Sequence, residues 1–243
     1  MDVRDVTDLA VLVDAENVPA RFADRLFEHV ATLGCASVRR AYGDFSGLWS
    51  AAWASACARH AIVSQQQFSA GAGKNSADIA LVVDAMELLA ESRVDAICLA
   101  SSDGDFSPLA LKLRERGMAL YGFGGADTPE RFRQACKRFT YLENLAPNAA
   151  ASLPVDVRIL KPIANVTGLL RRAFVHAKSQ EGWASLSDIE QLLPRLRADF
   201  DPRTYGQRNL LALVQRTKVF AVDMQHDNGP RVRLKRKTAI RQP

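Results

Sequence analysis

Acidic residues in the first half of the chain stand where carboxylates from separate strands can gather into one site. Asp14 ends the apolar run LAVLVD, and Asp103 and Asp105 follow a second apolar run, VDAICLAS. Asp78 follows a glycine-rich stretch, SAGAGKNS, at the start of an expected helix. Clustered carboxylates repel one another unless a cation neutralises them, and Mg²⁺ or Mn²⁺ suits carboxylate oxygens. Such an ion activates water and stabilises charge on a phosphoryl group, so the pattern indicates metal-assisted phosphodiester hydrolysis.

Two of these acids have a structural alternative close by in the sequence. Asp14 can form an Asx-turn or cap the helix expected near Pro19, but Asn17 is the better-placed cap, which leaves Asp14 free. Asp78 lies three residues after Asn75, and the two can form a capping-box-like pair. For Asp78 the residues alone leave both interpretations open.

The acids after the second run are interpreted by the same reasoning. Ser107 followed by Pro108 is a good helix start, with serine as the N-cap and proline at the first helical position. Asp103 and Asp105 are then not needed as caps. Asp84 lies six residues after Asp78, about 120° around a helix, and is interpreted as a structural or supporting acid.

Several other chemistries are excluded by the residues that are present. The stretch SAGAGKNS departs from the P-loop pattern, because Phe68 and Asn75 stand where Gly and Ser or Thr are required. A glycine-rich loop with Lys74 beside a helix start can still hold a substrate phosphate, the alternative being an ordinary surface loop. The turn DAENVP after the first strand lacks GxGxxG, which excludes a dinucleotide-binding site of that type. No His or Cys lies near these motifs to support a catalytic triad.

The elements that must position the acids alternate between strand and helix. Uniformly apolar strands that alternate with helices predict a central, mainly parallel sheet covered on both faces, with right-handed crossovers. The carboxyl ends of such strands meet at one crevice, where the strand order reverses. The expected strands are 9–14, 37–43, 61–68, 94–101, 118–124 and 138–143, and the expected helices are 19–33, 47–59, 76–91, 106–116 and 129–136.

The second half of the chain has a different pattern and a different charge. Residues 1–150 carry 15 Lys/Arg against 19 Asp/Glu, a net of −4, whereas residues 151–243 carry 17 against 8, a net of +9. A basic module of this kind suggests a polyanionic partner. Expected helices at 158–180, 186–197 and 204–216, then strands at 218–223 and 231–235, predict a winged helix-turn-helix. Basic candidates for RNA contact on its last helix and wing are Arg203, Arg208, Arg216, Lys218, Arg231 and Arg233.

Composition limits the class of protein. Apolar residues make up 48% of the 243-residue chain and charged residues 24%, which is typical of globular domains. No apolar run approaches the ~18 residues that a membrane span needs, and the N-terminus opens with acids rather than a basic secretory signal. Four scattered cysteines suit a reducing compartment, so we expect a cytoplasmic protein without membrane association.

Three blocks in the first half resemble the NYN domain, a branch of the PIN-like, metal-dependent ribonucleases. They are VLVDAENVP (11–19), GKNSADIALVVDAM (73–86) and LASSDGDFSPLALKLRERGMALYGFG (99–124). The resemblance implies a PIN-like three-layer domain and a metal bound by Asp14, Asp78, Asp103 and Asp105, with Asn17 orienting Asp14. Asp84 also matches a recurrent position of the family. The resemblance thus favours Asp78 as a ligand.

The second half resembles the OST-HTH, or LOTUS, domain, a winged helix proposed to bind RNA. The resemblance rests on GWASLSDIEQLLPRLRADFDPRTYGQRNLLALVQRTKVFAV (182–222) and RVRLK (231–235). We expect an NYN domain at 1–146, a linker at 147–157, an OST-HTH domain at 158–236 and a basic tail at 237–243.

The two resemblances together predict a ribonuclease that uses Mg²⁺ or Mn²⁺ and binds RNA. A catalytically weak RNA-binding adaptor on the same fold and a flap-type nuclease acting on DNA are the alternatives. A protein partner for the OST-HTH domain, the oligomeric state, the RNA target and the number of metal ions are left open by the sequence.

Overall fold

The computed structural model describes residues 7–47, 50–68, 75–145, 161–177, 179–226 and 229–235. The chain divides into two compact units, Met1–Ala149 and Ala150–Pro243. The expected linker at 147–157 and basic tail at 237–243 lie outside the described residues.

The first unit is built on a six-stranded sheet in which every described pair of neighbouring strands is parallel. The strand order is β3-β2-β1-β4-β5-β6. The direction of winding therefore reverses between β1 and β4, which places the crevice of a doubly wound sheet at their carboxyl ends. The strands are β1 (Asp8–Asp14), β2 (Cys35–Gly43), β3 (Val63–Gln66), β4 (Ala96–Ala100), β5 (Ala119–Gly124) and β6 (Arg138–Tyr141).

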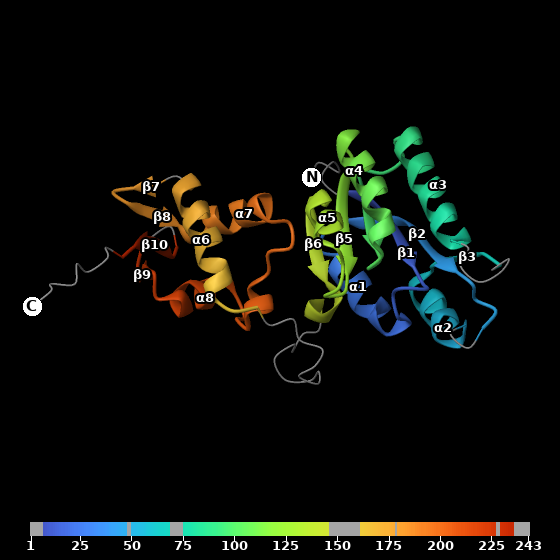
Figure 1. Ribbon diagram of the computed structural model, residues 1–243, viewed down its shortest axis with the longest axis horizontal. Coiled ribbons are helices and arrows are strands. Elements are labelled where there is room, and N and C mark those ends of the chain that lie inside the picture. The colour runs from blue at the N-terminus through green and yellow to red at the C-terminus, as the bar shows by residue number, and fades with distance from the viewer. Residues whose placement is uncertain are drawn as a thin grey trace, which may run out of the picture. The chain divides into compact units, whose positions relative to one another are not determined.

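Helices cover both faces of this sheet, as the apolar strands predict (Figure 1). Leu9, Val11 and Val13 of β1 share one core with residues of α1 and α2, such as Leu26 and Trp53. The α/β three-layer prediction is confirmed. The helices are α1 (Ala23–Val30), α2 (Ser50–His60), α3 (Ser76–Glu91), α4 (Ser107–Glu115) and α5 (Glu130–Ala135), with 3₁₀ turns η1 (Ala20–Phe22), η2 (Gly104–Phe106) and η3 (Leu142–Leu145).

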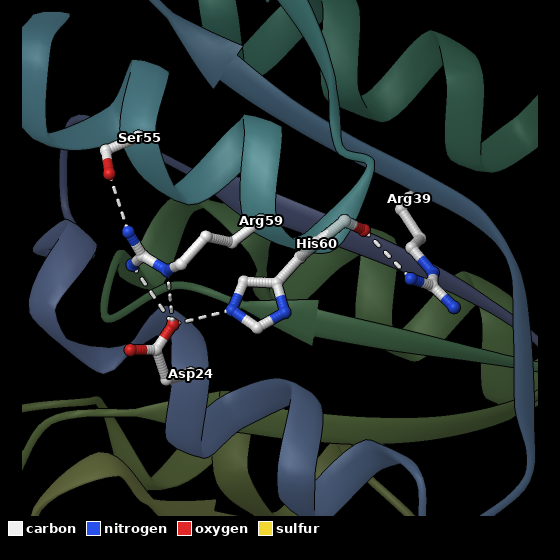
Figure 2. A network of polar contacts seen from close by, with 5 residues as sticks. All are labelled: Asp24, Arg39, Ser55, Arg59 and His60. Carbon is white, nitrogen blue, oxygen red and sulfur yellow. Dashed lines mark hydrogen bonds and ion pairs between the residues drawn. The ribbon is translucent and has the colours of Figure 1, made fainter.

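A polar network holds the carboxyl end of α2 against α1 (Figure 2). Asp24 Oδ1 accepts hydrogen bonds from Arg59 Nε at 3.1 Å and Nη2 at 3.0 Å, and it lies 2.6 Å from His60 Nε2. The His60 ring also stacks on Phe27, with 4.9 Å between the ring centroids. The bonds from His60 and Arg59 lower the pKa of Asp24. Two residues of α1, Asp24 and Phe27, therefore hold this end of α2.

The second unit combines helices with a four-stranded antiparallel sheet, which agrees with the predicted winged helix-turn-helix. The strand order is β7-β8-β10-β9. Its apolar core includes Leu170, Ile189, Leu213 and Val232. The elements are α6 (Ala164–His176), β7 (Ser179–Gln180), β8 (Trp183–Ser185), α7 (Leu186–Leu196), η5 (Pro202–Tyr205), α8 (Leu210–Thr217), β9 (Phe220–Asp223) and β10 (Arg231–Leu234).

Two predicted helices of this unit are wrong in part. The helix expected at 204–216 is interrupted, because Gly206 adopts a φ of 71° after η5 and α8 begins only at Leu210. Asn209 is the cap of α8, since its side-chain oxygen accepts from Ala212 N at 2.9 Å. Arg203 and Arg208 consequently lie before the last helix rather than on it.

The other error concerns the helix expected at 158–180, which ends at His176. A short hairpin of β7 and β8 follows it instead. Its two turn residues, Glu181 and Gly182, have φ values of 53° and 76°, as a tight two-residue turn requires. Strands this short carry too little alternation to be recognised in a sequence.

Within the described residues, none of the helices combines the length and the apolar character that crossing a membrane requires.

Candidate active site

Asp14 joins the ends of the two strands that flank the reversal of strand order. It is the last residue of β1 and is 2% exposed. Its Oδ2 accepts from Ser101 Oγ at 2.6 Å, and Ser101 directly follows β4. Asn17 Nδ2 donates to the same oxygen at 2.8 Å. The carboxylate is thus held from both strand ends.

The prediction that Asn17 caps the first helix is wrong. Its side chain donates to Asp14, and η1 is preceded by Pro19 with no side-chain cap. Asp14 itself makes the Asx-turn, because its Oδ1 accepts from the backbone nitrogens of Glu16 and Asn17, each at 3.2 Å. Burial raises the pKa of Asp14 in spite of these hydrogen bonds, which favour the charged form.

The prediction that Ser107 caps the helical region after β4 is wrong, because Asp103 has this role. Asp103 Oδ1 accepts from Asp105 N at 2.8 Å and so caps η2. Ser107 lies inside the helical region, and its hydroxyl donates to the carbonyl oxygen of Gly104 at 2.6 Å. Asp103 N donates to Ser101 Oγ at 3.0 Å, which links Asp103 to the serine that holds Asp14.

Asp78 shows that the acids share one region. It lies in the first turn of α3, and burial together with the charges of Asp14, Asp103, Glu16 and Asp105 raises its pKa to about 6. Asn75 precedes α3, but its side chain makes no capping hydrogen bond. Acids from three separate segments therefore lie close enough for their charges to act on one carboxyl group.

Glu16 belongs to this acidic region, although the sequence interpretation missed it. Its charge is among those that raise the pKa of Asp78, and its backbone nitrogen is bonded to Asp14. The available signal was its position in the DAEN block, directly after the strand-ending acid.

Asp84 lies in a different environment, on the side of α3 that contacts β2. Its Oδ2 accepts from Arg40 Nη1 at 2.7 Å and from Tyr42 Oη at 2.6 Å. Burial and the neighbouring Asp84 charge raise the pKa of Tyr42, so its hydroxyl remains a donor. These contacts are those of an acid that anchors α3, the helix that carries Asp78.

We expect Asp84→Ala to lower the free energy of unfolding by about 1–3 kcal/mol, because it removes the acceptor of two partly or fully buried donors. Tyr42→Phe, which removes only one of the two bonds, should cost about 1 kcal/mol. Chemical denaturation of the full chain, followed by circular dichroism, measures both. A neutral Asp84→Ala variant would contradict the anchoring role.

The donor set at the sheet edge suits a hard divalent cation. Asp14, Asp78, Asp103 and Asp105 offer only carboxylate oxygens, the ligands that Mg²⁺ and Mn²⁺ prefer. Mutual repulsion at Asp78 is the effect that a cation relieves. Across the part of the chain that the structure describes, no three His, Cys, Asp or Glu side chains already form a metal-binding group. Lys74 and the glycine-rich loop lie outside the described residues.

Some of the arginines proposed to contact RNA are engaged within the second unit. Arg203 is held by Asp201, with 2.6 Å from its Nη2 to Oδ2 of the acid. Arg231 Nε donates to Asp223 Oδ2 at 2.8 Å. These two side chains have local structural partners.

The remaining basic candidates are exposed: Arg208, Arg216, Lys218 and Arg233. Arg233 lies over the ring of Trp183, 4.7 Å from its centroid, and Arg231 lies 5.0 Å from the same centroid. An aromatic ring with two guanidinium groups is a surface on which nucleic-acid bases can stack.

Comparison with known proteins identifies both units. The family model of the NYN domain matches residues 8–143, and that of the OST-HTH/LOTUS domain matches residues 161–232. Both resemblances, and their order in the chain, are thereby confirmed. No curated protein matches the chain.

Solved structures show weaker overall similarity. A protein of unknown function from Vibrio parahaemolyticus is 20% identical with a TM-score of 0.47, and the match covers 60% of this chain and 98% of that one. An uncharacterized protein from Nitrosomonas europaea is 26% identical with a TM-score of 0.29, and the match covers 38% and 89% of the two chains.

Proposed function

This chain belongs to the NYN family, and because it also carries an OST-HTH/LOTUS domain we propose that it is a divalent-metal-dependent ribonuclease that binds RNA through its second unit. The family memberships support a role in RNA binding and nuclease chemistry. Hydrolysis, the metal requirement and the residues that carry them are the parts we propose.

The observation that carries the proposal is the charge environment of Asp78. Burial, and after it the charges of four other acids, raise its pKa to about 6, and those acids belong to the end of β1, the turn after it and the segment after β4. Carboxylates that repel one another cost stability unless they serve a bound cation. The repulsion among these carboxylates is therefore best explained by a site that binds a divalent cation.

Some residues of the site would bind the cation, and others orient the residues that bind it. Asp14, Asp78, Asp103 and Asp105 would hold Mg²⁺ or Mn²⁺, which supplies water activation and charge stabilisation at phosphorus. Asn17 and Ser101 fix the Asp14 carboxylate through Oδ2. The Asp103 cap fixes the turn that also carries Asp105. Lys74 remains a candidate for contact with a substrate phosphate.

An RNA-binding adaptor is the second candidate, favoured by one observation. In the stretches that the structure describes, no three acidic or imidazole side chains are already close enough to bind a metal. Binding of RNA without hydrolysis would then be the activity of the chain, and the acids would be a structural remnant of the fold.

The experiment that separates these functions uses the purified full chain with end-labelled single-stranded RNA and DNA of matched sequence. We expect RNA to be cleaved with Mn²⁺ or Mg²⁺ and not with EDTA. Binding of RNA without cleavage under all metal conditions would favour the adaptor. Preferential cleavage of DNA would identify a DNA nuclease instead.

A further inference from the structure

A cavity of about 500 Å³ lies beside the acidic region, between the end of β1, the end of β2 and α2. Its size is within the range of small-molecule sites, which are mostly apolar with a few polar groups that fix orientation. Residues of three segments line it: Glu16 and Arg21, Asp44 and Phe45, and Ala52 and Trp53.

The apolar walls of the cavity are held in place by hydrogen bonds. Trp53 Nε1 donates to the carbonyl oxygen of Ala15 at 3.2 Å, which fixes α2 against the β1 turn. Phe45 N donates to Gln66 Oε1 at 2.9 Å. The Asp24 network holds the other end of α2 (Figure 2). The Trp53 indole and the Phe45 backbone are therefore held in place before a ligand binds.

The polar groups of the cavity include two carboxylates. Asp44 N donates to Glu16 Oε1 at 3.3 Å, and Gln66 Nε2 donates to Asp44 Oδ1 at 2.8 Å. An ionised carboxylate accepts hydrogen bonds and has about four acceptor positions. Asp44 Oδ1 also accepts from the backbone nitrogen and the hydroxyl of Ser46, so Asp44 is already engaged within the protein. Glu16 is therefore the carboxylate that a ligand with N–H donors would meet in the cavity.

Glu16 links the cavity to the proposed catalytic edge. Glu16 lines the cavity, and its backbone nitrogen donates to Asp14 Oδ1 at 3.2 Å. Arg21 contributes a cation to the same lining. A ligand in the cavity would therefore lie near a phosphate held at the acids.

We propose that this cavity binds one nucleobase of the RNA strand, next to the phosphate that reaches the acids, and that it prefers guanine. The proposal rests on the ribonuclease function proposed above and adds a base-specific subsite to it. Guanine places two neighbouring N–H donors, N1–H and the 2-amino group, opposite a carboxylate. Adenine, cytosine and uracil each place an acceptor beside their donor, which a carboxylate repels.

The test measures binding in EDTA, so it does not depend on cleavage. The full chain, labelled with ¹⁵N, is titrated with guanosine, adenosine, cytidine or uridine, nucleosides without a phosphate that the acids would repel. The Trp53 indole N–H signal, assigned by its loss in Trp53→Phe, reports on the cavity. We expect guanosine to shift this signal most strongly.

Ala52→Phe fills the cavity from an exposed position on α2 and should weaken guanosine binding at least about tenfold, the range of one lost aromatic contact. Ala58→Phe, also exposed on α2 but not among the lining residues, is the matched control. Glu16→Gln should reduce the preference for guanosine over adenosine, which tests the carboxylate without filling the cavity.

Each outcome decides the proposal. Absence of a Trp53 shift with all four nucleosides, or an equal shift in Ala52→Phe, would overturn the base site. Equal affinity for all four would overturn the guanine preference. Guanosine binding without any RNA cleavage would leave the base site intact and reject the ribonuclease, whereas cleavage without guanosine binding would do the reverse.

Discussion

Asp78→Asn is expected to slow RNA cleavage at least about 100-fold while raising the melting temperature of the metal-free protein. Loss of residues that only support a metal ligand costs 10–100-fold in typical sites, so loss of a ligand should exceed about 100-fold. The stabilisation follows because the substitution removes a charge that four acids oppose. Since Asp78 is partly solvated, we expect about 1 kcal/mol, or roughly 3 °C.

The measurements are cleavage of labelled RNA and thermal unfolding at pH 8, each with Mn²⁺ and with EDTA. An ion that binds only the folded state raises its stability, so Mn²⁺ should raise the melting temperature of the wild type and not of Asp78→Asn. Glu87→Gln, an exposed acid on the same helix, is the control for a change of charge alone. Full cleavage activity in Asp78→Asn would remove this residue from the mechanism.

Asp14→Asn provides the contrasting case, since it should lose both cleavage and stability. Both oxygens of Asp14 accept hydrogen bonds, from Ser101 and Asn17 on one side and from two backbone nitrogens on the other. An amide accepts on one side only, so one pair of donors would face an NH₂ group. A loss of about 1–2 kcal/mol is expected. Equal stability of Asp14→Asn and the wild type would contradict the structural role.

The second large effect is expected on RNA binding. The triple variant Arg216→Ala/Lys218→Ala/Arg233→Ala removes three exposed cations from α8, from the residue that directly follows it and from β10. Each phosphate contact on single-stranded nucleic acid contributes about 0.7 to the slope of log K against log salt concentration. The slope should therefore fall by about 2, and affinity at 0.1 M salt should fall about 100-fold. Fluorescence anisotropy with labelled RNA in EDTA, at several salt concentrations, measures both quantities.

A variant of equal charge distinguishes a specific surface from general attraction. Arg171→Ala/Arg172→Ala/Arg195→Ala removes three exposed cations from α6 and α7. We expect it to retain most of the affinity and of the salt slope. If the two variants weaken RNA binding equally, the net charge of the second unit, rather than the surface of α8 and β10, accounts for binding.

The principal elements of the first unit could be predicted because their signals are local. Leu9 to Val13 form an unbroken apolar run, and such a run covered on both faces is typical of a parallel strand. The turn at Gly206 and the hairpin at Glu181 were not predicted, because a single residue with positive φ leaves no periodic pattern.

The roles of the individual acids were predicted only in part. Their positions after apolar strands or at a helix start predicted that Asp14, Asp78, Asp103 and Asp105 gather at one end of a parallel sheet. The sequence did not reveal that Asp14 is held by Ser101, because the two residues are 87 positions apart. Nor did it reveal that Asp103 rather than Ser107 caps the turn, because both are good caps by type.

By itself, the sequence determined that apolar strands alternate with helices, that a basic module follows, and that four acids stand at strand ends and a helix start. These features depend on the types and the spacing of residues that are close together in the chain, and the sequence gives both directly. Only the tertiary structure decided which acids repel one another, that Glu16 joins them, and that a cavity opens beside them. Burial, charge interaction and hydrogen bonding depend on residues that folding brings together from distant segments, and no local pattern contains that information.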